Sequence, residues 1–198
     1  MKPLILVTAA TLAAFGFAGT PGARAAKKTQ GTGAKTRVDT IMGFANDRMS
    51  TQIDAMFDDG DFPAVISLLR VQAEAYPSNY DVWTNLGWMQ ENVQAYDSAL
   101  ATYVRYRRQN EQDPDAALPE ATYYYNRRLY AKVPPLMEPA IKGKCHPNAF
   151  RILARSYEKQ DMLNDAARVY KALTVRDPND GAAKANLKRV EGKLGKGS

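Results

Sequence analysis

The sequence of 198 residues contains little of what enzymes and metal sites need. It has one cysteine, Cys145, and one histidine, His146. A single cysteine cannot form an internal disulfide, and the usual zinc and haem sites need more ligands of these two types. There is also no serine–histidine–aspartate set, phosphate-binding glycine loop or dinucleotide fingerprint. We therefore expect no catalysis, no cofactor and no metal ion. Cys145 is interpreted as a buried small apolar residue, with an intermolecular disulfide as the alternative.

Long apolar runs are also absent, except at the amino terminus. There PLILVTAATLAAFGFAG follows Lys2 and precedes Ala23-Arg24-Ala25, which has small residues where signal peptidase reads. This pattern predicts a signal peptide, residues 1–25, cleaved after Ala25. The alternative is an uncleaved anchor, for which the run is short and rich in glycine. We expect export to the periplasm or cell exterior, without stable membrane insertion after cleavage. Residues 26–37, AKKTQGTGAKTR, are polar and basic and predict a disordered leader.

What the sequence does contain is an internal repeat. Two segments align, DVWTNLGWMQENVQAYDSALATYVRYRR and NAFRILARSYEKQDMLNDAARVYKALTVRDP. Both have a large apolar residue, then a Leu–small pair, then an Ala followed four residues later by Tyr. These are Trp83, Leu86-Gly87, Ala99 and Tyr103 in the first, and Phe150, Leu153-Ala154, Ala166 and Tyr170 in the second. Apolar residues at three- and four-residue steps predict paired helices, and the small residues permit close contact between them.

The second segment closely resembles the tetratricopeptide-repeat (TPR) family, which repeats every 34 residues. This resemblance implies an all-α solenoid of antiparallel helix pairs with a right-handed superhelical twist. The TPR domain is predicted over 38–198, with repeats at about 46–79, 80–114 and 147–180. Gln90 replaces the family's first-helix aromatic, and the first helix is expected to start near Val38. Residues 181–195 predict a solvating, capping helix.

The segment 115–146 resembles the family least and is interpreted as a degenerate repeat. ALPEATYYYNRRLYAKV predicts one helix, and PPLMEPAIKGK predicts a short second helix interrupted by prolines. The Tyr and Arg residues of YYYNRRLY could stack on bases and contact phosphates. Because export argues against nucleic acid, we instead expect these tyrosines to replace the missing aromatics of the core.

The resemblance also implies a binding groove lined by the first helix of each repeat. Carried over by register, the candidate residues are Asp54 and Asp58 from the first repeat, Asp81, Thr84, Asn85 and Trp88 from the second, and Arg151 and Arg155 from the fourth, with Glu158 and Lys159 beside them. Trp88 lies about 140° around the helix from the core residue Trp83, so it is predicted to be exposed as a binding anchor. The alternative is that the long first helix or the leader covers it. The clamp that some TPR domains use for chaperone tails is disfavoured, because its positions hold Ser50 and Asp54.

Charge is strongly segregated along the chain. Residues 38–120 carry 5 basic and 14 acidic side chains, whereas residues 121–198 carry 16 basic and 7 acidic ones. Such polarity favours a partner of matching charge. The leading hypothesis is an adaptor or scaffold that binds a protein or peptide partner in the groove. The alternative is a structural component that forms homo-oligomers through its opposite charge poles. Solvated helix faces with no specific partner would also give this pattern.

Overall fold

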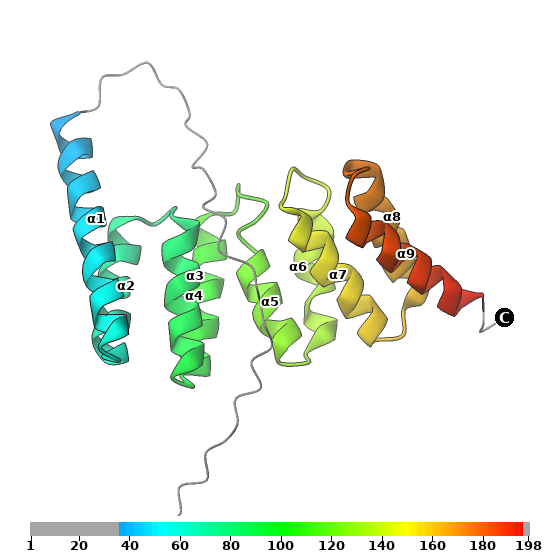
Figure 1. Cartoon of the computed structure of the whole chain (residues 1–198), viewed down its shortest axis with the longest axis horizontal. Helices are drawn as coiled ribbons and strands as arrows, with labels where there is room; N and C mark the ends of the chain where they lie inside the picture. Colours follow the sequence, from blue (N-terminus) through cyan, green and yellow to red (C-terminus); the bar gives the residue numbers. More distant parts are fainter. Residues whose placement is uncertain (1–35, 196–198) are drawn as a thin grey trace, which may run out of the picture.

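The structure is a computed structural model that describes residues 36–195, so the predicted signal peptide and most of the predicted leader lie outside the described residues. Within 36–195 the secondary structure is helical throughout. The elements are α1 (Arg37–Asp58), α2 (Phe62–Ala75), α3 (Tyr80–Asn92), α4 (Tyr96–Gln109), α5 (Leu118–Asn126), the 3-10 helix η1 (Tyr130–Lys132), α6 (Pro134–Ala140), α7 (Pro147–Lys159), α8 (Leu163–Arg176) and α9 (Gly181–Leu194). They stand side by side along the long axis of the molecule, from α1 at one end to α9 at the other (Figure 1). No helix in this part of the chain combines the length and apolar character needed to cross a membrane.

The first helix starts slightly earlier than expected. Thr36 and Asp39 form a capping box, in which the Asp39 N–H donates to the Thr36 hydroxyl over 3.1 Å and the Thr36 N–H donates to the Asp39 carboxylate over 3.0 Å. These bonds satisfy two of the backbone donors that a helix start leaves unpaired. The last two residues of the predicted leader, Thr36 and Arg37, therefore belong to the start of α1.

Four left-handed residues set the period of the fold. Gly60, Gln94, Arg128 and Asp161 have φ between 59° and 76° and stand 34, 34 and 33 residues apart. At each of them the N–H donates to the carbonyl three residues back, and the next N–H donates to the carbonyl five residues back. This is the double hydrogen bond of a Schellman motif, which ends a helix and reverses the chain. Every hairpin from α1 to α8 thus turns at the same point of the repeat.

The third repeat keeps this turn although its sequence resembles the family least. The prediction of one helix over residues 117–133 is wrong, because α5 ends at Asn126 and Arg128 adopts φ 60°. The second half of the repeat begins at Tyr130, as η1, and continues from Pro134 as the seven-residue α6. A proline carries no backbone N–H for a helix bond, so Pro134 starts a new helix instead of continuing η1.

Close contact between paired helices explains the small residues of the repeat. A Cβ atom on Gly87 would lie 2.1 Å from Cε1 of Tyr103, so the ring packs directly on the backbone of α3. The Tyr103 hydroxyl donates to Glu91 over 2.9 Å. In the α7–α8 hairpin the Tyr170 hydroxyl donates to Glu158 over 3.1 Å at the same twelve-residue separation. The tyrosine of the second helix therefore joins the paired helices by packing and by hydrogen bonding.

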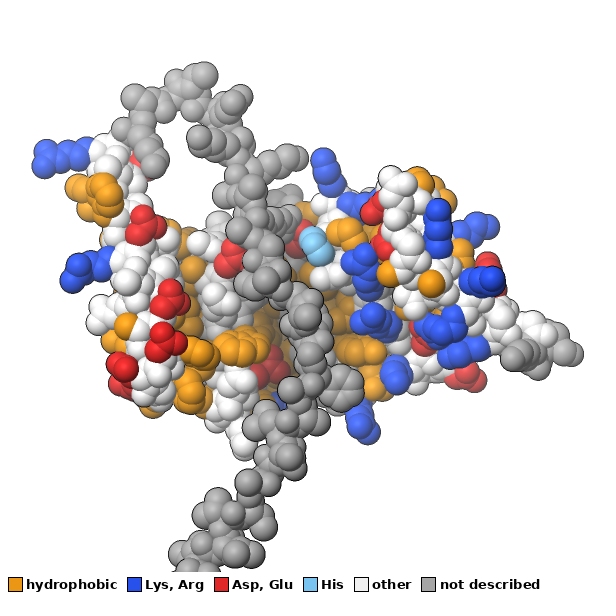
Figure 2. Space-filling model, in the orientation of Figure 1, with side chains coloured by type: hydrophobic (Ala, Val, Ile, Leu, Met, Phe, Trp, Pro, Cys, Tyr) orange, Lys and Arg blue, Asp and Glu red, His pale blue; other side chains and the backbone are white. Residues whose placement is uncertain are grey.

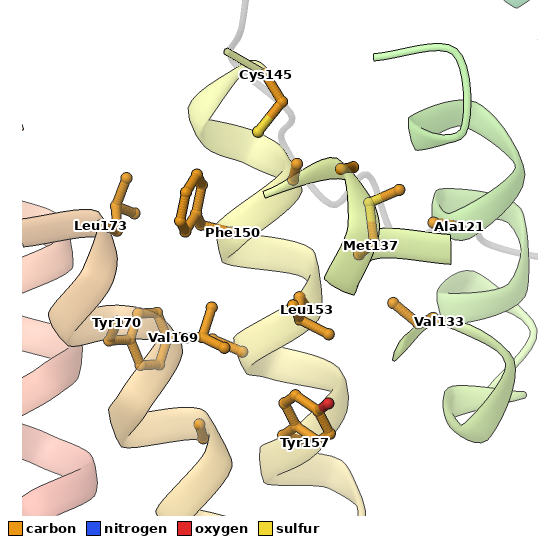
Figure 3. Close-up of a cluster of buried hydrophobic side chains, with 14 of the residues drawn as sticks. Ala121, Val133, Met137, Cys145, Phe150, Leu153, Tyr157, Val169, Tyr170 and Leu173 are labelled. Atoms are coloured by element: carbon orange, nitrogen blue, oxygen red, sulfur yellow. The ribbon is translucent and has the colours of Figure 1, made fainter. Parts of the chain in front are cut away.

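Within residues 36–195 the buried apolar side chains form three clusters, and the largest extends across neighbouring hairpins from α5 to α9. Figure 3 shows Phe150, Leu153 and Tyr157 of α7 between the side chains of α8 and those of Val133, Met137 and Ala121. Tyr123 is 7% exposed and packs against Tyr103 with ring centroids 6.2 Å apart, as expected for a replacement core aromatic. Gln90 is buried at the family's aromatic position, where its side-chain oxygen accepts from the Thr102 hydroxyl over 2.8 Å. Cys145 is also buried.

The helical glycines Gly87 and Gly43 should respond in opposite directions to alanine. Gly87→Ala forces the buried Tyr103 ring to move and should lower the free energy of unfolding by about 1–3 kcal/mol, the usual cost of overpacking. A methyl group added to Gly43 would meet no atom within 4 Å beyond the adjacent backbone of α1, so Gly43→Ala should stabilise α1 by about 0.5–1 kcal/mol through helix propensity. Urea unfolding followed by circular dichroism measures both. Equal effects of the two substitutions would contradict the close contact.

Candidate functional site

The first helices of the hairpins share one surface, which we call the first-helix face. At the ninth and thirteenth positions of successive units this surface carries Asp54 and Asp58, Trp88 and Asn92, Thr122 and Asn126, Arg155 and Lys159, and finally Arg189 and Lys193. The side chains therefore change from acidic to aromatic and polar, and then to basic. Figure 2 shows acidic side chains along α1 at one end and a concentration of Lys and Arg over α7 and α9 at the other. The segregation of charge along the sequence is thus also a polarity of this surface.

A polar hollow of about 180 Å³ lies between α1 and α3. Its lining comprises Asn46, Ser50, Ile53, Asp54, Leu69, Gln72, Asn79, Asp81, Val82 and Asn85. The buried Gln72 amide donates to Asn46 over 2.9 Å and to Ser50 over 3.1 Å, which satisfies the polar floor. Asn85 is exposed, and its carboxamide makes no hydrogen bond within residues 36–195. It can donate to and accept from a bound chain without breaking an existing contact.

Trp88 is exposed next to this hollow. Half of its surface is accessible, and its ring lies 6.3 Å from that of Phe57, which is itself 5.8 Å from Phe62. These three side chains form an exposed aromatic patch, and Figure 2 shows hydrophobic side chains at the surface between α1 and α3. The helix α1 touches one side of Trp88 without covering it. Within residues 36–195 Trp88 is therefore exposed, as predicted.

The structure separates the remaining predicted residues into available and occupied groups. Asp54 and Asp81 line the polar hollow, and Asp58 is exposed at the end of α1. Thr84 lies one turn after the start of α3, and its hydroxyl donates to the carbonyls of Tyr80 and Asp81. Thr84 is therefore occupied.

Arg151 is also occupied. It pairs with Asp180 at 2.5 Å, and the same carboxylate accepts the Ala183 N–H at the start of α9. This pair holds the last helix in place, so a structural role explains Arg151 better than a place in the groove does.

A second hollow, of about 310 Å³, lies among α5, α7 and α9. It is lined by Tyr125, Arg155, Glu158, Lys159, Arg189 and Lys193, and we call it the cation pocket. Sequence reasoning misses Arg189 and Lys193, because the pattern of residues 181–195 predicts a solvating cap. The signal was present, however, since each of them follows a cation of α7 by one 34-residue period.

Glu158 is the one acidic residue in the lining of this pocket, and it is fully engaged. Its two carboxylate oxygens accept hydrogen bonds from Nη1 and Nη2 of Arg189, over 2.5 and 2.8 Å. The Lys193 ammonium lies 3.5 Å from the same carboxylate. Burial alone would raise the pKa of Glu158, but the hydrogen bonds from Arg189 and Tyr170 outweigh it and hold the pKa below the usual value of 4.5. Burial and the neighbouring Glu158 raise the pKa of Tyr170 to about 12, so this phenol remains a donor.

The lowered pKa makes the contact between α9 and α7 sensitive to acid. The stabilisation is complete above the unfolded-state pKa of Glu158, near 4.5, and is lost as the pH falls through the lower folded-state pKa. Glu158→Gln should therefore cost about 1 kcal/mol at pH 7, and this cost should fall as the pH is lowered below 4.5. Thermal unfolding of both proteins between pH 3 and 7 measures this difference. A cost independent of pH would contradict the assignment.

Comparison with known proteins identifies the fold. No protein-family model and no curated protein sequence matches the chain. Among solved structures, MamA superposes with a TM-score of 0.59 at 15% sequence identity, over 77% of this chain and 84% of that one. A double mutant of RS-1 MamA gives 0.58 at 13% identity, over 77% and 86% of the two chains. MamA from residue 41 onward, from Desulfovibrio magneticus RS-1, gives 0.54 at 13% identity, over 78% and 94%. MamA is a TPR-type helical solenoid, and the chain described here has the same all-α, TPR-type fold.

Proposed function

We propose that this protein is an exported, non-enzymatic scaffold that holds another polypeptide on its first-helix face. The observation that carries the proposal is the half-exposed Trp88, which forms an aromatic patch with Phe57 beside the amide-lined hollow between α1 and α3. Exposed aromatic clusters on soluble domains usually mark interaction sites. Tryptophan is also among the residues that contribute most to binding energy when a partner covers them.

The surroundings of Trp88 suit an extended chain. Asn85 lies one helical turn before it with a free carboxamide, which can bond to the backbone of a bound segment as amides do. Asp54 and Asp81 at the same end and Arg155 at the other make the surface polar along its length. Complementary charges of this kind give a partner a preferred direction and exclude partners of the opposite polarity.

A second candidate function is self-association into an envelope assembly. The acidic side chains over α1 and the basic ones over α7 and α9, seen in Figure 2, are complementary between two copies of the chain. Each copy offers both signs, so a copy that binds through its acidic end leaves its basic end available. This arrangement can produce closed pairs or longer assemblies.

Substitution of Trp88 tests the scaffold proposal. Trp88→Ala should reduce recovery of the native partners from envelope extract by about tenfold or more, the loss typical of an interface anchor. Val175→Ala on α8 is the matched control, because Val175 is 75% exposed on a second helix. It should leave recovery unchanged. Equal yields with wild type and Trp88→Ala would remove the support for this surface.

Sedimentation at low and high salt tests the alternative. Contacts between exposed charges weaken as salt rises, so a self-associating chain should be larger at about 20 mM salt than at about 500 mM. Asp54→Lys combined with Asp58→Lys reverses the charge of the acidic end and should give a monomer at both concentrations. If the wild type is also a monomer at both, self-association is excluded.

A further inference from the structure

We infer that the cation pocket among α5, α7 and α9 binds the carboxylates of an acidic polypeptide segment, so that α9 is a binding element as well as a cap. This inference rests on the proposed function, because it names the chemistry of a partner that lies on the first-helix face. The same surface that has acidic side chains on α1 ends at this pocket.

The first argument is the regular placement of the cations. Arg155 and Lys159 are one turn apart on α7, and Arg189 and Lys193 stand at the same two positions of α9. Glu158 of α7 accepts two hydrogen bonds from Arg189 of α9, so the four cations form two neighbouring rows. Side chains two or three residues apart in an extended chain are separated by about 7–10 Å. A strand crossing from α7 to α9 can place acidic side chains against both rows.

The second argument is the balance of charge inside the pocket. Four cations face a single carboxylate, that of Glu158, and Arg189 already neutralises it through two hydrogen bonds. Arg155 and Lys159 are exposed and form no ion pair within the described part of the chain. By contrast, Arg105 pairs with Glu74 and Arg168 with Glu138. Cations held together without counter-charges repel each other, and a bound carboxylate relieves that repulsion.

The third argument separates an acidic polypeptide from a nucleic acid. A nucleic acid carries a negative phosphate at every nucleotide. A strand that lies along this face would therefore be repelled at the opposite end by Asp54, Asp58 and Asp81. The aromatic side chain of the pocket, Tyr125, packs against Tyr130 with centroids 5.3 Å apart, which restricts base stacking on it. A polypeptide can carry acidic residues at one end only, and it then matches both halves of the surface.

Direct titration of the full chain with labelled peptides tests the inference. The probe is fluorescein-labelled Gly-Glu-Ala-Glu-Gly-Glu-Gly, and its counterpart has Gln in place of each Glu. The Glu peptide should bind and the Gln peptide should not. Arg155→Gln combined with Lys159→Gln should weaken binding by about tenfold or more, as for loss of two charge-assisted contacts.

The control removes the same net charge elsewhere. Lys171→Gln combined with Lys184→Gln alters exposed cations that do not line the pocket, and binding should stay within about twofold of wild type. Circular dichroism of both double variants establishes that they are folded. Equal weakening by the two pairs would show a response to net charge only and would overturn the inference, as would failure of the wild type to bind the Glu peptide.

Two further arms distinguish other outcomes. Inorganic phosphate is added as a competitor at a concentration that supplies the same total negative charge as the peptide. Displacement of the peptide under this condition would show a general anion site and would overturn the assignment to an acidic polypeptide. Trp88→Ala should retain binding of the Glu peptide, because this short probe reaches only the pocket. If native partners are still recovered with Trp88→Ala while the Glu peptide binds normally, the proposed role of Trp88 fails and the cation pocket stands.

Discussion

The left-handed turn that ends each first helix is the constraint on which the rest of the structure depends. Gly60, Gln94, Arg128 and Asp161 reverse the chain at steps of 34, 34 and 33 residues, each with the same pair of backbone hydrogen bonds. Only one of the four is glycine, so packing of the hairpins offsets the cost of the left-handed conformation at the other three. Because the turns recur at a constant period, the helices stack in register. The repeat with the least typical sequence retains this register through Arg128, although its second helix is reduced to η1 and α6.

The same register builds the surface. A residue at a given position of one first helix comes to lie beside its equivalent in the next, so the ninth and thirteenth positions form rows of acidic, aromatic, polar and basic side chains. The rows explain how Asp54 and Asp58 of α1 and the cations of α7 and α9, far apart in the sequence, become the opposite ends of one face. They also give Trp88 its position between the charged ends, next to the side chains of α1. A solenoid converts a pattern along the sequence into a pattern in space because each unit contacts only its neighbours.

Polar contacts complete the packing between paired helices. Gln90 and Thr102 pair where the family has an aromatic side chain, and Tyr103 and Tyr170 each bond to a glutamate of the facing helix. At the last helix, Arg151 pairs with Asp180 while Glu158 binds Arg189, so α9 is attached to α7 at two points. Glu158 thereby orders Arg189 and leaves the neighbouring cations of α7 without a counter-charge. One carboxylate thus supports both the position of α9 and the charge of the pocket.

The sequence by itself determined the all-helical repeat, the small–aromatic contacts of two hairpins, the start of the first helix to within a residue, and the exposure of Trp88. These follow from local periodicity and from side-chain size, which can be read along one helix at a time. It did not reveal the turn at Arg128, since an arginine in the left-handed region has no compositional signature and the surrounding Tyr and Arg residues favour a continuous helix. Nor did it separate Arg151, which is engaged with Asp180, from Arg155, which is available, because that difference depends on contacts between residues about 30 positions apart. Only the tertiary structure decided which charges are neutralised, and therefore which part of the repeating surface is open to a partner.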